Sequence, residues 1–173
     1  MAVLEIFHFP HPVLKQKTRP IQKIDPKILQ LVQDMAQTMY SAPGVGLAAP
    51  QVGHSLRVAV IDVTPADQPK NLLVLINPEI VATEGECTWE EGCLSVPDCN
   101  EEVKRCKKVV VRYQNLQGET AEIIGEELLA IALQHEIDHL DGILFIDRLS
   151  PLKRRLLKRK LLKKDKDKEE KKI

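Results

Sequence analysis

The feature that most constrains this chain is a pair of histidines four residues apart, in the segment His135-Glu136-Ile137-Asp138-His139. Residues at this spacing lie on one face of an α-helix, so both imidazoles can reach a single metal ion. Glu136 lies about 100° around the helix from the first histidine. It can therefore reach a water at the metal without being a ligand itself. The pattern predicts a metal-binding helix of the kind found in hydrolases.

A surface helix that carries two histidines by chance is the alternative interpretation. Leu128 and Ala132 fall on the same helix face as His135 and His139, at successive spacings of 4, 3 and 4 residues. This apolar face predicts a buried helix, and buried histidines need polar or metal partners. The flanking residues therefore favour the metal-binding interpretation.

The third ligand is not where metalloproteases usually supply it. Gly142 fits the extended pattern HExxHxxGxxH, but Phe145 occupies the position of its last histidine. A downstream glutamate is the other common solution, and only Glu169 and Glu170 are available, both in a highly charged segment. The remaining histidines lie far upstream without helical pairing, and we expect them to be surface or structural residues: His8, His11 and His54.

A cysteine is the remaining candidate for the third ligand. The chain has four, Cys87, Cys93, Cys99 and Cys106, with no CxxC pair and no secretion signal, so free thiols are expected. Cys93 follows Gly92, which allows close approach of the backbone. The residues by themselves nevertheless leave the other three cysteines open. A thiolate with two imidazoles would leave a fourth coordination position for water, which is the arrangement of a catalytic site.

A glycine-rich segment, Gly44-Val45-Gly46-Leu47-Ala48-Ala49, formally fits the dinucleotide-binding pattern. That pattern should follow a strand and open a helix. Here a predicted helix precedes it, and Pro50 follows immediately. A tight turn with small residues packed beneath it is the simpler interpretation. Gln51 then follows, and its side-chain amide could be a donor aimed at a substrate oxygen.

Residue patterns along the chain predict an α+β fold. Apolar periodicity, capping residues and turn residues indicate helices over 25–41, 125–140 and from 150 onward, and strands over 56–63, 72–81, 109–113 and 120–124. This order predicts antiparallel or mixed strands packed around a central HExxH helix, with a C-terminal helix. We expect one catalytic metallohydrolase domain over 1–149, a basic helix over 150–164 and a charged, disordered tail over 165–173.

Charge is distributed unevenly, although the total formal net charge is zero. Residues 150–173 hold twelve Lys and Arg and four Asp and Glu, so this segment carries +8 and the remainder −8. No apolar run approaches the ~18 residues of a membrane span, so no membrane partner is expected. Aromatic residues make up 3% of the chain, too few for stacking platforms that bind single-stranded nucleic acid. We expect no DNA partner.

Three segments together resemble the peptide deformylase family: GVGLAAPQ at 44–51, EGCLS at 91–95 and QHEIDHLDG at 134–142. The resemblance extends over residues 3–165. It implies a bacterial cytoplasmic hydrolase that removes the N-formyl group from the formylmethionine of newly synthesised polypeptides and releases formate. It also implies one Fe²⁺ per chain, with Zn²⁺, Ni²⁺ or Co²⁺ as substitutes in purified protein.

The resemblance also implies roles for individual residues. Cys93, His135 and His139 would bind the metal, Glu136 would be the catalytic acid and base, and the Gln51 side chain and the Leu94 backbone N–H would stabilise the oxyanion. The substrate pocket would be formed by Val45, Gly46, Trp89, Gly92, Leu128, Ile131 and Ala132. One position departs from many relatives, because Asn100 stands where they have an arginine. This difference concerns how the distal part of the peptide is held.

Two other functions remain as alternatives: an HExxH zinc endopeptidase, against which the missing downstream ligand argues, and a metal-stabilised binding module. The basic segment also has two interpretations. It is either a solvated helix that aids solubility or, as the resemblance implies, a contact with ribosomal RNA near the emerging nascent chain.

Overall fold

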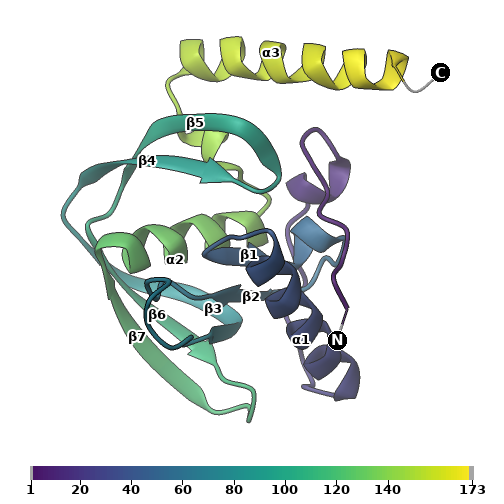
Figure 1. The fold of residues 1–173 in the computed structure, drawn as a ribbon. Coiled ribbons are helices and arrows are strands. Elements are labelled where there is room, and N and C mark those ends of the chain that lie inside the picture. Colours follow the sequence, from purple (N-terminus) through teal and green to yellow (C-terminus); the bar gives the residue numbers. More distant parts are fainter. Residues whose placement is uncertain (1, 172–173) are drawn as a thin grey trace.

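A five-stranded antiparallel sheet forms the base of the molecule in the computed structural model, which describes residues 2–171 (Figure 1). Its strands lie in the order β1 (Gly46–Ala48), β2 (Val58–Ile61), β3 (Leu73–Glu84), β6 (Lys108–Gln114) and β7 (Thr120–Glu126). A separate antiparallel hairpin consists of β4 (Cys87–Cys93) and β5 (Val96–Arg105). The tight connection between β6 and β7 contains Gly118, whose φ of 80° suits glycine.

Three α-helices complete the fold: α1 (Pro26–Ser41), α2 (Glu127–Leu140) and α3 (Pro151–Glu170). Short 3₁₀ turns are η1 (Pro12–Lys15), η2 (Ala49–Val52) and η3 (Phe145–Arg148). Local sequence explains two helix starts. The Asp25 side chain accepts from the backbone N–H of Ile28 at 3.0 Å, and Ser150 caps α3 in the same manner.

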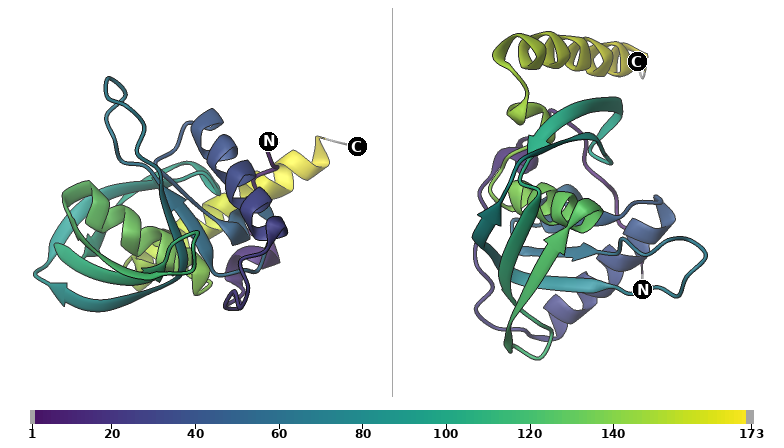
Figure 2. Two further views of the ribbon diagram at one scale, coloured as in Figure 1. Left: turned by 90° about the horizontal axis from the view of Figure 1, so that it is seen from below. Right: turned by 90° about the vertical axis from the view of Figure 1, so that its left-hand side faces the viewer.

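Helix α2 lies between the five-stranded sheet and the β4–β5 hairpin, and α3 lies on the far side of the hairpin (Figures 1 and 2). The inner face of α2 buries Ala130, Leu133 and Ile137 against Val109 and Val111 of β6. This arrangement confirms the predicted α+β fold with strands around a central HExxH helix. Burial on both sides removes most of α2 after Leu129 from water, so a polar atom there that lacks a protein or metal partner costs free energy.

Helix α1 packs against β1 and β2, beside the layer formed by α2 (Figure 2). Its two methionines, Met35 and Met39, are fully buried in a cluster with Val58 and Val60 of β2. These methionines therefore serve as core packing. The cluster anchors β1, and with it the glycine-rich segment that faces α2.

The hairpin was missed by the sequence patterns. Strand β5 contains Pro97, Asp98 and two glutamates, and its charged residues hide the buried Cys99 and Val103. Its polar residues are stabilised by pairing across the hairpin and by ion pairs with other elements. Alternation of apolar and polar residues is therefore a weak signal in this strand.

Helix α3 continues to Glu170, so the prediction of a disordered tail is wrong for residues 165–170. This stretch has no glycine or proline, and it places Lys163 four residues before Asp167 and Lys166 four before Glu170. Oppositely charged pairs at this spacing stabilise a helix. Residues 172–173 of the predicted tail lie outside the described residues. In the part of the chain from 2 to 171, no helix has the length and apolar character needed to cross a membrane.

Candidate metal centre

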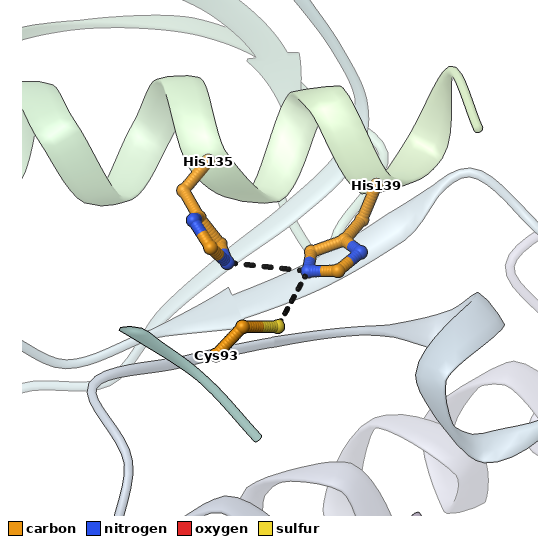
Figure 3. Close-up of side chains that lie close together, drawn as sticks. All are labelled: Cys93, His135 and His139. Carbon is orange, nitrogen blue, oxygen red and sulfur yellow. Dashed lines mark hydrogen bonds between the residues drawn. The ribbon is translucent and has the colours of Figure 1, made fainter. Parts of the chain in front are cut away.

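Cys93, at the end of β4, meets His135 and His139 of α2 (Figure 3). The Cys93 Sγ lies 3.3 Å from His139 Nε2, and this nitrogen lies 3.2 Å from His135 Nε2. One ligand atom from each residue lies within 4.8 Å of the other two. A soft thiolate and two imidazoles at this separation fit a divalent transition metal. Within residues 2–171 this is the one such group, and Cys87, Cys99 and Cys106 take no part in it.

Two local features bring the cysteine to the histidines. The hairpin register pairs Cys93 with Val96, so the thiol stands at the tip next to the turn, and a register shift occurs between Glu91 and Cys93. At Gly92 a Cβ would come 2.4 Å from the Asn100 Oδ1, so no larger residue fits without displacement. The glycine expected to allow close approach therefore does so against a side chain of the neighbouring strand.

His135 is oriented by a carboxylate that the sequence analysis did not single out. Its Nδ1 lies 2.9 Å from Glu91 Oε1, and Arg105 donates two hydrogen bonds to the same carboxylate at 2.7 and 2.8 Å. Burial alone would raise the pKa of Glu91, but the hydrogen bonds from Arg105 and His135 outweigh it and lower the pKa to about 2. The ionised carboxylate fixes the tautomer of His135, so that Nε2 faces the cluster.

Phe145 contributes to the same histidine. Its ring lies 6.2 Å from that of His135, centroid to centroid, in a stacked arrangement. Phe145, which occupies the position of the last histidine in the pattern HExxHxxGxxH, thus packs against the first histidine, His135. The upstream histidines His8, His11 and His54 are all exposed, as predicted.

Glu136 is buried beside the cluster without joining it. Its side chain is 4% exposed, and its Oε2 has no hydrogen-bond partner in the described structure. Burial raises the pKa of Glu136 to about 7. A carboxyl group near neutrality can both accept and donate a proton at physiological pH. A Cβ at Gly46 would lie 2.5 Å from Glu136 Oε1, which explains why glycine occupies this position of the glycine-rich segment.

Gln51 lies in η2, and both the oxygen and the nitrogen of its side-chain amide form hydrogen bonds. Its Oε1 accepts from the Ala48 backbone N–H at 3.0 Å, and its Nε2 donates to Ser95 Oγ at 3.1 Å. The same nitrogen lies 3.7 Å from the Cys93 Sγ. The glycine-rich segment thus forms an edge strand and a turn that present an amide donor to the cluster, and the formal match to a nucleotide pattern is not realised.

A cavity of about 400 Å³ opens beside the cluster. All the predicted substrate-binding residues line it: Val45, Gly46, Trp89, Gly92, Leu128, Ile131 and Ala132. Gln51, Cys93, Leu94, His135 and Glu136 line it as well. Ile131 and Ala132 form a buried, apolar part of its lining, whereas the side chains of Val45 and Trp89 are partly exposed. An extended apolar group can therefore lie beside the polar cluster.

Residues 3–155 match the family model for polypeptide deformylase. The chain belongs to this family. The peptide deformylase of Syntrophobacter fumaroxidans is 54% identical over 167 residues, which cover 96% of this chain and 98% of the relative.

Solved structures of peptide deformylases also match this chain in fold and sequence. The crystal structure of a peptide deformylase from Legionella pneumophila has a TM-score of 0.88 and 47% identity, covering 96% of this chain and 98% of that one. The peptide deformylase from Ehrlichia chaffeensis in complex with actinonin has a TM-score of 0.88 and 37% identity, covering 95% and 98%.

Membership of the deformylase family confirms the resemblance drawn from the three motifs and identifies the chain as an enzyme. It disfavours both the zinc endopeptidase and the binding module. The sequence analysis missed the partners of the candidate ligands, chiefly Glu91 and Arg105. Only the position of Glu91 two residues before Cys93, on the same face of an extended strand, could have indicated it.

Proposed function

We propose that this enzyme removes the N-formyl group from the N-terminal formylmethionine of newly synthesised polypeptides, producing formate and a free amine. The observation that carries the proposal is the convergence of Cys93, His135 and His139 on one cavity that also contains Glu136. Full-length similarity to peptide deformylases supports the same substrate class. We assign catalysis to residues 1–149.

Cys93, His135 and His139 would hold one divalent cation per chain. When bound, such a cation lowers the pKa of water towards ~7 and polarises a carbonyl group. Affinity order alone favours Zn²⁺ over Fe²⁺. The family resemblance supports Fe²⁺ as the ion used in the cell, with Zn²⁺, Ni²⁺ or Co²⁺ in purified material. A ferrous thiolate site is expected to lose activity in air.

Glu136 moves the protons of the reaction. The oxygen of water attacks the formyl carbon, and Glu136 takes the proton that this water releases. The C–N bond then breaks, and Glu136 passes the proton to the departing amine nitrogen. Its position beside the ligands and its unpartnered Oε2 support this role. Proton transfer of this kind typically contributes about 10²–10⁴-fold to the rate.

Gln51 and the backbone N–H of Leu94 would stabilise the oxyanion that develops on the formyl oxygen. Hydrogen bonds with Ala48 and Ser95 hold the Gln51 amide in place, which preorganises it for this role. Loss of one donor of this type costs about 2.7–4 kcal/mol of transition-state stabilisation.

The apolar cavity would take the methionine side chain, which is unbranched and apolar and would contact lining residues such as Ile131, Ala132 and Trp89. Selectivity for formyl over acetyl must come from steric exclusion at the cluster, because a mere loss of contact for one methyl group is worth only about 1–3 kcal/mol. Formyl-Met peptides should be cleaved and acetyl-Met peptides should not. Comparable rates for the two would rule out a tight formyl site.

The direct test is formate release from a formyl-Met tripeptide under anaerobic conditions, with metal analysis of the same sample. Stoichiometric metal and steady formate release are expected. A metal-loaded sample that releases no formate would refute the proposal. Digestion of casein by the same sample would instead support the endopeptidase.

Its partners would be formylated nascent chains, so the enzyme would act in the bacterial cytoplasm, where ribosomes synthesise them. The basic helix α3 would contact the ribosome. Lys153 and Lys158 form ion pairs with Glu101 and Asp147 of the body. Arg155, Arg159 and Lys163 are exposed at successive spacings of four residues, so they form a positive stripe suited to phosphate groups.

A further inference from the structure

A line of alternating charges runs from the surface to the metal centre. It begins at Arg148, whose side chain is 45% exposed, and continues through Asp138 and Arg105 to Glu91, which contacts His135. Arg105 and Glu91 are each 2% exposed. The four charged residues come from four different elements, namely η3, α2, β5 and β4. The line therefore joins the segment that leads into α3 to a metal ligand.

The geometry of each contact is well defined. Arg148 holds the Asp138 carboxylate with two bonds, Nε to Oδ2 at 2.7 Å and Nη2 to Oδ1 at 2.6 Å. Arg105 donates through Nη1 to the same Oδ2 at 2.6 Å. Its remaining nitrogens form the two-pronged contact with Glu91 that orients His135. Asp138 Oδ2 is thus shared by the two guanidinium groups.

Charge balance in this line depends on Arg148. Two carboxylates face two guanidinium groups, so the line is neutral overall. Without Arg148, Asp138 and Glu91 would share Arg105 alone, and one buried negative charge would be uncompensated. Asp138 would then attract Arg105 more strongly, which would weaken its two-pronged hold on Glu91.

We propose that Arg148 is a positioning residue for the metal centre: by neutralising Asp138 it keeps Arg105 on Glu91 and thereby keeps His135 oriented for metal binding. Arg148 touches neither the ligands nor the cavity beside them, so it acts entirely through these residues. Partners beyond the ligands typically alter metal affinity or activity by about 10–100-fold. The inference rests on the proposed metal centre, but it concerns metal binding and does not depend on the substrate.

The test compares Arg148→Gln with the matched control Arg112→Gln in the full chain loaded with Co²⁺. Arg112 also pairs with a carboxylate, that of Glu122 at 3.0 Å, and its side chain is 52% exposed, but the pair lies on the sheet. The Co²⁺ dissociation constant is measured by competition with a chelator, and the thiolate-to-cobalt absorption band reports the ligand geometry.

Arg148→Gln should weaken Co²⁺ binding about tenfold, at the lower end of the range for such partners, and shift the absorption band. Arg112→Gln should change neither. Arg148→Lys, which retains the charge without the two-pronged contact, should fall between wild type and Arg148→Gln. In an Asp138→Asn background, Arg148→Gln should add little, because the charge that it neutralises is already absent.

Unchanged Co²⁺ affinity and an unchanged band in Arg148→Gln would overturn the inference, even if its unfolding temperature fell, because Arg148 would then be only structural. Equal effects of Arg112→Gln would also overturn it. A wild-type chain that binds Co²⁺ but releases no formate would refute the proposed function and leave this inference standing. A wild-type chain that binds no Co²⁺ would refute the metal centre and the inference together.

Discussion

Glu136 and His135 are neighbours in sequence, yet the structure gives them different surroundings. The imidazole of His135 finds Glu91, whereas the carboxylate of Glu136 has an oxygen without a partner. A polar atom left unpaired in a buried site costs free energy, so its retention indicates a use outside folding. At the scale of residues, the two proposed roles, metal ligand for His135 and proton carrier for Glu136, differ by one step around the helix.

Replacement of Glu136 by Ala should separate these two roles. The variant should retain the metal, because all three ligands remain, and lose turnover by about 10²–10⁴-fold, the usual contribution of proton transfer. Metal content and formate release are measured on the same sample. Loss of the metal in Glu136→Ala would show that the glutamate is structural.

Turnover should also be sensitive to substitution of Gly46, the neighbour of Glu136. A Cβ in Gly46→Ala would lie 2.5 Å from Glu136 Oε1, so the carboxylate must shift away from its present position. We expect turnover to fall by at least tenfold, about 1.4 kcal/mol, with the metal retained. Gly118→Ala is the control. The added Cβ would have an Ile24 methyl group at 3.8 Å as its nearest neighbour, and Gly118 does not line the cavity beside the cluster. Its positive φ should lower stability but not turnover. Wild-type turnover in Gly46→Ala would contradict this account.

At the scale of elements, α1 and β2 are joined by a polar contact as well as by the core. The carboxylate of Asp62, the residue directly after β2, accepts hydrogen bonds from the Tyr40 hydroxyl of α1 at 2.6 Å and from the backbone N–H groups of Thr64 and Asn71 at 2.9 and 3.0 Å. Burial opposes ionisation, but these hydrogen bonds outweigh it and lower the pKa of Asp62 to about 2. The contact fixes the loop that follows β2 onto the helix that anchors β1.

Asp62→Asn should therefore destabilise the protein at neutral pH. Hydrogen bonds to a charged group are worth about 1.5–3 kcal/mol, and we expect a loss of about 2 kcal/mol. Because the folded pKa lies below the ordinary value of 3.8, the contribution of Asp62 is complete at neutral pH and disappears as the pH falls from about 4 to about 2. Urea unfolding of both proteins across this range measures it. A difference in free energy that stays constant down to pH 2 would exclude the linkage.

At the scale of the whole molecule, α3 stands apart from the catalytic layers, beyond the hairpin (Figure 2). Leu157 and Leu161 pack it onto the body, together with the ion pairs of Lys153 and Lys158. These contacts leave the opposite side of the helix free. The acidic part of the chain therefore forms the layers around the cavity, whereas the basic residues are concentrated on α3.

The exposed stripe of α3 should mediate ribosome binding through charge. The triple variant Arg155→Gln, Arg159→Gln and Lys163→Gln should bind ribosomes several-fold more weakly, and its affinity should depend less steeply on salt, because fewer counterions are released. Formate release from a tripeptide should be unchanged. The control replaces Lys17, Lys23 and Lys27, exposed on the body, with Gln. Equal ribosome binding by both variants and wild type would exclude this role of α3.

The sequence by itself determined the central helix and most of the sheet, and it placed on that helix two histidines at metal-ligand spacing with a glutamate between them. These features depend on spacings of a few residues, which the geometry of a helix or strand fixes directly. It did not reveal the β4–β5 hairpin, whose charged residues conceal its buried face, and the residues alone left open which cysteine is the third ligand. Family resemblance pointed to Cys93.

Only the tertiary structure decided the contacts between distant segments. Cys93 meets His139 across 46 positions of the sequence, and Arg148 reaches His135 through residues of three other elements. The hairpin register and the packing of α2 beneath it determine these contacts. The physical reason is that a buried charge is stable only beside its partner, and that partner is chosen by how whole elements pack, which no local pattern encodes.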